Sequence, residues 1–474
     1  MNLKKYFGPK VFYASALSLA VPVMLQALVQ NLVSLIDNFM VAGLGDIKMS
    51  GINVTNQVLF VLFVAFNILA AAGGMFMSQY NGAKDASGMK HAYRFKIITM
   101  GTLALLIMAL GALIPDQLLG LLLQSNTERA EITAEGIKYL SIIIFTFLPM
   151  AVSIAIGSSL RETGRVRPPL VISVAAALLN TFLNWIFIYG NLGAPRLEVA
   201  GAAWATLTAR LVEMALFILW ARKHKPAFFV GLRGILAVNL PLFFTMLTKS
   251  GVLFISEMSW VLTETIMTAV FNGRGGSEIV SGMAGAWAIA NLFFLVFGAI
   301  HTSIGVIVGG TLGKNDLETA RIQARWLRTG ALFTGILVSA GEFASVLLIP
   351  LVFGNLSENA RAITHNMLWI IALYMPIWTY LNAQFATARS GGDAIMGAWV
   401  DGAVNVVLFL PGIFLLAALT PFGPVTLFAI VKLTDIVKVS IAAWQLRKER
   451  WLKNLTGSGG PPEGGPLPGF EGAV

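Results

Sequence analysis

The chain has 474 residues, of which 57% are hydrophobic and only 12% are charged. A soluble domain averages about 45–50% hydrophobic and 25% charged residues, so this composition excludes a soluble protein of the same length. The formal net charge of +10 does not require a nucleic-acid partner, because membrane proteins collect Lys and Arg in their cytoplasmic loops. The sequence has no cysteine and four scattered histidines, which excludes disulfides and thiol nucleophiles and predicts no protein-held metal cluster.

Apolar runs of about 20 residues recur along the chain, and each is long enough to cross the ~30 Å hydrocarbon core of a bilayer as a helix. We therefore predict an all-α polytopic membrane protein with twelve transmembrane helices. In chain order they cover residues 12–40, 51–80, 95–115, 134–160, 168–190, 198–221, 236–271, 280–311, 326–353, 362–388, 394–418 and 423–446.

Lys and Arg fall mainly on one side of these predicted helices. When both termini are placed in the cytoplasm, 23 of the 33 lie in cytoplasmic segments and 6 lie in outer segments. Cytoplasmic loops of membrane proteins carry such an excess of positive charge. The asymmetry therefore predicts that both termini are cytoplasmic.

The two halves of the chain carry similar short motifs in the same order, at offsets of 231, 228 and 230 residues. The pairs are GAKD at 82–85 with GKND at 313–316, RETG at 161–164 with RSGG at 389–392, and GAP at 193–195 with GP at 423–424. Six helices per repeat is an even number, so both repeats cross the membrane in the same direction. This predicts two six-helix lobes, related by a pseudo-two-fold axis along the membrane normal, around a central cleft. Chance recurrence of Gly-rich loops is the alternative.

The repeat and the local composition divide the chain into four parts. They are an N-lobe at 1–221, a basic cytoplasmic linker at 222–235, a C-lobe at 236–453 and a Gly- and Pro-rich stretch at 454–474. The last part is too rich in Gly and Pro to form a packed element, so we expect a disordered tail or an expression scar there.

Polar side chains share one face of the first predicted helix, where Gln26, Gln30, Ser34 and Asp37 follow one another at helical spacing. An ionisable residue in a membrane span is costly and suggests a functional site. The fifth and sixth predicted helices add Asn180, Asn184 and Thr206. A carboxylate among such oxygens could coordinate a monovalent cation, and a desolvated carboxylate could carry a proton. The alternative is a buried hydrogen-bond network that holds helices together.

The second half has its own ionisable residues in the predicted span 236–271, namely Lys249, Glu257 and Glu264. The two glutamates are seven residues apart and so face the same way. We expect this set to act on substrate or ion, with Asn382 as a further polar candidate for the cleft. A second group is interpreted as structural; it comprises His301, Glu342, Asp401, Lys432, Asp435 and Lys438. A cleft with aromatic and Met residues would suit lipophilic or cationic ligands.

The order of several motifs resembles that of the multidrug and toxic compound extrusion (MATE) family. They are NLVSLID at 31–37 with VAGLG at 41–45, QYNGAK at 79–84, LRETG at 160–164, NTFLNWIFIYG at 180–190 with GAAWAT at 201–206, and Asn382 with ARSGGD at 388–393. Their order and the six-plus-six layout cover residues 10–450, whereas no single motif is decisive. Whether the chain is NorM-like or DinF-like stays open.

This resemblance implies a V-shaped pair of lobes and a bacterial or archaeal cell-membrane antiporter that exports lipophilic or cationic drugs, driven by Na⁺ or H⁺. Carried over by position, the coupling site would be Asp37, Asn180, Asn184 and Thr206. Glu257 matches an acid of NorM-like members, whereas their helix 10 acid has no counterpart, since residues 378–389 contain no Asp or Glu. Some branches carry Asp where Asn184 stands.

Two other functions are compatible with a polytopic membrane protein. A flippase for a lipid-linked precursor would need several basic residues in the cleft, and only Arg210 and Lys249 are candidates in the sequence. An intramembrane enzyme would need a nucleophile and base or a metal site, which the sequence does not offer. We therefore expect a non-enzymatic transporter, without a cofactor other than its coupling ion, that works as a monomer in the bilayer.

Overall fold

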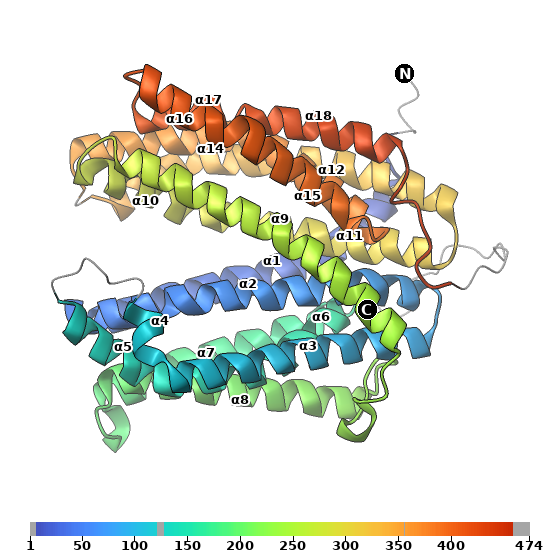
Figure 1. Ribbon diagram of the computed structural model, residues 1–474, viewed down its shortest axis with the longest axis horizontal. Helices are drawn as coiled ribbons and strands as arrows, with labels where there is room; N and C mark the ends of the chain where they lie inside the picture. Colours follow the sequence, from blue (N-terminus) through green and yellow to red (C-terminus); the bar gives the residue numbers. More distant parts are fainter. Residues whose placement is uncertain (1–5, 121–127, 355, 458–474) are drawn as a thin grey trace.

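The computed structural model describes residues 6–120, 128–354 and 356–457, and its regular structure within those ranges is helical (Figure 1). The first half contains α1 (Lys10–Ala42), α2 (Asp46–Gly82), α3 (Ala86–Leu113), α4 (Pro115–Gly120), α5 (Arg129–Ile143), α6 (Phe147–Glu162), α7 (Arg167–Tyr189) and α8 (Glu198–His224). The second half contains α9 (Leu240–Asn272), α10 (Ser277–Phe293), α11 (Leu295–Gly313), α12 (Leu317–Ser345), α13 (Ile349–Val352), α14 (Glu358–Ser390), α15 (Ala394–Val404), α16 (Leu410–Leu419), α17 (Pro424–Val431) and α18 (Thr434–Arg447). Short 3-10 or π turns join some neighbours.

Ten stretches of the described residues are helical, long and apolar enough to cross a membrane. Several of them join two consecutive helices, as α5 with α6 and α10 with α11 do. Two further crossings complete the predicted twelve. One is α14, whose polar first turns lower its mean hydropathy, and the other is α17 with α18, which a turn at Lys432–Leu433 divides into two pieces.

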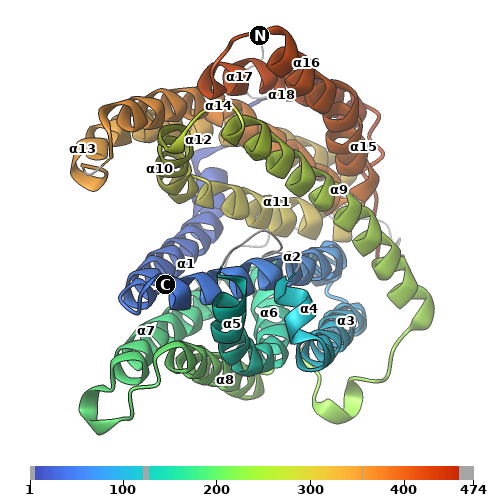
Figure 2. The same ribbon diagram turned by 60° about the vertical axis from the view of Figure 1, so that its left-hand side comes forward.

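The helices form two lobes, as predicted (Figure 2). Helices α1–α8 build one lobe and α9–α18 build the other, while α1 and α2 pack along α11 at the boundary between the lobes. Each lobe buries its own apolar residues, with Phe66, Phe95 and Ile156 in the first and Phe271, Ile371 and Phe428 in the second. The predicted two-bundle, twelve-helix fold class is therefore confirmed.

The GAKD and GKND motifs form matching loops at one end of the molecule, at the right in Figure 1. Lys84 (φ 56°) and Asn315 (φ 63°) adopt the left-handed conformation in the two loops. The next residue, Asp85 or Asp316, then caps α3 or α12 by accepting hydrogen bonds from backbone N–H groups of the first turn. We call this end, with its loops 83–85 and 314–316, the basic end.

The lobes touch at the basic end through a reciprocal contact between α2 and α11. A Cβ atom on Gly82 would lie 1.9 Å from Gly310 O, and a Cβ atom on Gly313 would lie 1.9 Å from Gln79 O. Gly82 and Gly313 occupy equivalent positions of the two repeats, and so do Gln79 and Gly310, because each pair is separated by 231 residues. Only glycine lets the two backbones approach this closely, so the pseudo-two-fold axis passes through a glycine-lined junction.

Residues that follow α18 reinforce this junction. The Gln79 side chain donates to Ser390 O (2.7 Å) and Lys453 O (3.1 Å), and it accepts from Leu455 N (2.6 Å). Leu455 also packs against the core of the first lobe. The packed chain therefore extends past residue 454, where we expected the tail to begin, because Leu455 has both an apolar and a polar partner. Residues 458–474 lie outside the described part.

Repulsion between lysine side chains of the two lobes opposes their contact at the basic end. Burial, together with the positive charge of Lys84 in the other lobe, lowers the pKa of Lys314 from its usual value. The closed basic end is thus a balance between close glycine packing with backbone hydrogen bonds on one hand and cationic repulsion on the other.

Candidate functional site

The first lobe contains a polar cavity of about 660 Å³, a size typical of small-ligand sites. Residues of α1, α2, α6, α7 and α8 line it, with two residues of α11, Gly298 and Thr302. The residues named from the sequence that line this cavity are Gln26, Gln30, Ser34, Asp37, Asn180, Thr206 and Arg210. The polar face of α1 therefore does look into one cavity, as its spacing indicates.

Asp37 lies among hydrogen-bond donors of α7. Asn184 Nδ2 donates to Asp37 Oδ1 (2.9 Å), and Thr181 Oγ1 reaches the same oxygen at 3.5 Å. When the Asn180 amide is oriented to satisfy both neighbours, its nitrogen donates to Asp37 Oδ2 (2.7 Å) and its oxygen accepts from Thr206 N (3.2 Å). The four residues of the expected coupling site are thus assembled around one carboxylate.

Asn184 is 2% exposed, and its Oδ1 has no hydrogen-bond partner among the described residues. A buried acceptor without a partner is unusual and calls for an explanation. Thr181, which the sequence reasoning passed over, lies between Asn180 and Asn184 on α7 and faces the same carboxylate. The periodicity of α7 could have identified it, since Thr181 is three residues before Asn184.

Toward the basic end the same cavity contains a second charged group. Glu213 is 3% exposed and accepts from Ser173 Oγ (2.8 Å) and Arg210 Nη1 (2.8 Å). Arg161 also lines the cavity, and no hydrogen bond or ion pair to its guanidinium group is found among the described residues. Two carboxylates and two guanidinium groups leave this cavity formally neutral.

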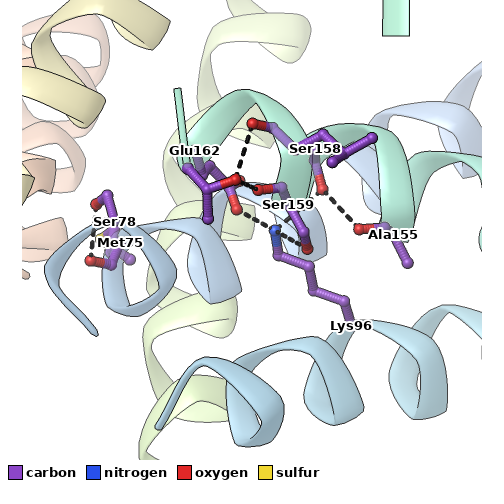
Figure 3. A network of polar contacts seen from close by, with 9 residues as sticks. Met75, Ser78, Lys96, Ala155, Ser158, Ser159 and Glu162 are labelled. Carbon is purple, nitrogen blue, oxygen red and sulfur yellow. Dashed lines mark hydrogen bonds and ion pairs between the residues drawn. The ribbon is translucent and has the colours of Figure 1, made fainter. Parts of the chain in front are cut away.

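Behind Arg161, the RETG motif fastens α6 to α3 (Figure 3). Lys96 is fully buried, pairs with Glu162, and donates to Ser158 Oγ (3.0 Å) and Ser159 Oγ (3.4 Å). A Cβ atom on Gly74 would lie 2.3 Å from Glu162 Oε1, so α2 leaves room for the pair by carrying glycine. This network gives the motif a structural role.

We expect Lys96→Met to lower the free energy of unfolding by about 3–5 kcal/mol, because it leaves the Glu162 carboxylate without its partner. The matched control is Lys138→Met, which removes a lysine from the exposed Lys138–Glu135 pair and should cost less than about 1 kcal/mol. Unfolding by sodium dodecyl sulfate in mixed micelles measures both. Equal losses in the two variants would contradict the structural role of the buried pair.

The second lobe contains its own cavity, of about 730 Å³. Glu257 and Glu264 both line it, as their spacing predicts, and so do Asn382 and His301, whose side chains hydrogen-bond each other (3.2 Å). Lys249 lies outside this cavity, because its Nζ donates to Gly392 O (2.6 Å) in the loop after α14. The basic partner of Glu257 is instead Arg389 (2.8 Å).

Four ion pairs among the described residues organise this cavity, and two of them share Lys438. Glu264 pairs with Lys432 (2.6 Å), while Lys438 lies 3.2 Å from Asp401 and 3.3 Å from Asp435. Trp378 Nε1 also donates to Asp435 (2.8 Å). In the sequence, Asp435 has a lysine three residues away on either side, Lys432 and Lys438. Lys432, at the turn before α18, reaches Glu264 on α9 instead. Of the residues interpreted as structural, all except Glu342 line the cavity.

A model of the MatE family matches residues 22–186 and 253–415, two segments that begin 231 residues apart. The probable multidrug resistance protein NorM of Halalkalibacterium halodurans is 22% identical over 433 residues, which cover 87% of this chain and 89% of that protein. A MATE transporter of Vibrio cholerae has a similar fold, with a TM-score of 0.82 at 18% identity over 93% of this chain and 98% of the other.

A further solved structure, titled as the outward-facing conformation of a multidrug resistance MATE family transporter, has a TM-score of 0.81 at 19% identity and covers 92% of this chain and 96% of that one. The family model covers most of the chain. One matched segment lies in the first lobe and the other lies in the second lobe. The chain belongs to the MatE family, the multidrug and toxic compound extrusion family of membrane efflux transporters.

Proposed function

We propose that this chain is a multidrug efflux antiporter, in which movement of the two lobes exposes a site to either side of the membrane and a cation drives the cycle. The observation that carries the proposal is the single carboxylate of Asp37, held by Asn180, Asn184 and Thr181 in a cavity between helices of the first lobe. The relative named as a probable multidrug resistance protein NorM supports small-molecule drugs as the substrate class.

The basic end is cytoplasmic in this proposal, because most Lys and Arg lie on that side. The glycine junction of α2 and α11 then closes the cytoplasmic side of the cleft, as expected of an outward-facing state. Alternating access requires this junction to separate and the opposite ends of the lobes to approach each other.

The coupling ion is Na⁺ with H⁺ as a competitor. Glu213 is paired with Arg210, whereas no ion pair to Asp37 is found among the described residues. A monovalent cation or a proton at Asp37 would neutralise this unpaired charge locally, which a low-dielectric site favours. The amides now present nitrogen atoms to Asp37, so Na⁺ binding requires that they rotate and present oxygen. Rotation of the Asn184 amide breaks no hydrogen bond of its Oδ1, because this oxygen has no partner among the described residues. Amides also coordinate a cation without titrating.

The charges in the cavities do not favour the flippase alternative. Basic residues that could hold phosphates are present in both lobes, yet Arg210, Arg389, Lys432 and Lys438 are each engaged by a carboxylate of the chain. Arg161 alone offers too little positive charge for a pyrophosphate group, whereas both cavities have apolar walls as well as polar residues.

The test is drug exclusion by cells. Bacteria that lack their own efflux pumps and express this chain should accumulate less ethidium and norfloxacin than the same cells with an empty vector. Dissipating the ion gradients with an ionophore should abolish the difference. Equal accumulation in both strains, at verified membrane expression, would contradict the proposed function.

A further inference from the structure

Lys432 occupies a position in the second-lobe cavity that has the geometry of a cation-binding site. Its ammonium group lies 5.4 Å from the ring centroid of Phe409, 5.5 Å from that of Phe428 and 5.7 Å from that of Trp378. Glu264 Oε1 completes the surroundings at 2.6 Å. Aromatic faces combined with a carboxylate are the arrangement by which proteins recognise organic ammonium ions.

We propose that Lys432 is a tethered occupant of an organic-cation site, and that a cationic substrate binds by taking its place between Glu264 and these three aromatic rings. The proposal rests on the proposed efflux function and assigns Lys432 as the group that an aromatic monocation displaces when it binds in the second-lobe cavity. Removing the Lys432 charge would then tighten the binding of such substrates, even though it also breaks the ion pair that this lysine forms in the structure.

The charge of the cavity supports an exchange of this kind. The described residues that line it include the carboxylates of Glu257, Glu264, Asp401 and Asp435, against the basic groups of Arg389, Lys432 and Lys438. The cavity therefore has one negative charge in excess when His301 is neutral. A monovalent cation restores neutrality, which a desolvated site favours.

The displaced ammonium also has a partner to move to. Asp401 and Asp435 share the single ammonium of Lys438, at 3.2 and 3.3 Å. Asp435 is three residues after Lys432, and the turn at Lys432–Leu433 separates α17 from α18 at this point. Lys432 can thus leave Glu264 for Asp435 without being left unpaired.

A second, independent feature indicates a ligand in this cavity. Residues Asn405–Phe409 form a π-helical turn between α15 and α16, and such turns are frequent at functional sites. Asn405 lines the cavity and is 1% exposed, yet neither its Oδ1 nor its Nδ2 has a hydrogen-bond partner among the described residues. A substrate with a polar group beside its cationic ring system would satisfy this amide.

Ethidium is a suitable probe, because it is an aromatic monocation with two amino groups. Dihydroethidium has the same ring skeleton and amino groups without the positive charge, and its middle ring is reduced, so it serves as the neutral comparison. Binding of both dyes to the full-length chain in lipid nanodiscs can be followed by fluorescence anisotropy, with the reduced dye kept free of oxygen.

The absence of cysteine from the chain allows the charge at position 432 to be set chemically in one variant. Lys432→Cys treated with methyl methanethiosulfonate carries a neutral side chain, and the same variant treated with 2-aminoethyl methanethiosulfonate regains an ammonium group at lysine-like length. We expect the neutral form to bind ethidium about tenfold more tightly than the aminoethyl form and the wild type. Dihydroethidium affinity should change less than about twofold.

Lys249→Cys, treated with the same two reagents, is the matched control, because Lys249 is a lysine of the same lobe outside the cavity. It should show no difference between its neutral and charged forms. Equal ethidium affinity of the neutral and aminoethyl forms at position 432 would overturn the proposal. If ethidium exclusion by cells persists in that case, the efflux function stands while the role of Lys432 fails.

Glu264→Gln keeps the proposal testable if the variant at position 432 does not fold. The carboxylate is the partner for which Lys432 and the substrate compete, so its loss should weaken ethidium binding about tenfold and leave dihydroethidium binding within about twofold. Unchanged ethidium affinity in Glu264→Gln would show that the cation does not bind between this glutamate and the three aromatic rings.

Discussion

Asp37→Asn should reduce ion-driven drug efflux to the level of membranes that lack the protein, while the protein stays folded and inserted. Asp37 is the only carboxylate in the group formed with Asn180, Asn184 and Thr206, so its charge is what a cation or proton would neutralise. The introduced amide has the shape of the carboxylate. It can accept from Asn184, and Asn180 can donate or accept according to the orientation of its own amide.

The control for this prediction is Asp46→Asn, because Asp46 is a carboxylate in the first turn of α2, outside the first-lobe cavity. Ethidium efflux from cells, normalised to the amount of protein in the membrane, compares the two variants. Asp46→Asn should retain nearly all of the wild-type rate. Wild-type efflux in Asp37→Asn at equal expression would remove Asp37 from the mechanism.

Gly313→Leu should also abolish transport, for a conformational reason. A Cβ atom at this position would lie 1.9 Å from Gln79 O in α2, and a larger side chain would prevent α2 and α11 from meeting at the basic end. The outward-facing state depends on that contact, so the variant should remain in states whose basic end is open. Gly82→Leu, at the equivalent position of the other lobe, should behave in the same way.

A distance measurement can detect this shift directly. Spin labels on cysteines introduced at Lys84 and Lys314 would report the separation of the two lobes, because the native chain has no cysteine. Gly101→Leu is the control, since a Cβ atom on Gly101 meets nothing within 4 Å. Short label distances and normal efflux in Gly313→Leu would show that the junction is not required.

Most of the fold could be predicted from the sequence, because the bilayer fixes the length of each apolar run and the spacing of the GAKD and GKND motifs fixes the repeat. The positions at which two of the crossings are interrupted were not predicted. The expected span 280–311 is divided at Phe294 between α10 and α11, and the last crossing turns at Lys432–Leu433. Neither break involves a Pro at the break itself, so tertiary packing decides these positions.

The first-lobe site follows from local periodicity, since Gln30, Ser34 and Asp37 lie on one face of a single helix. The second-lobe cavity does not, because its ion pairs join helices far apart in the sequence. The predicted spans place Arg389 in a cytoplasmic loop, yet it lies in the last turn of α14 and reaches Glu257 on α9. Charge alone made Lys249 the candidate, and only the three-dimensional arrangement shows that its ammonium group binds a loop carbonyl.

Ethidium uptake into everted membrane vesicles tests the central claim most directly, which is that a cation bound at Asp37 drives export. The vesicles are loaded with Na⁺ and diluted into Na⁺-free buffer, with the pH gradient collapsed. We predict uptake that depends on the Na⁺ gradient, is inhibited when the proton concentration rises, and is absent in Asp37→Asn. Uptake that persists without any ion gradient, or that is the same in Asp37→Asn as in the wild type, would contradict the account.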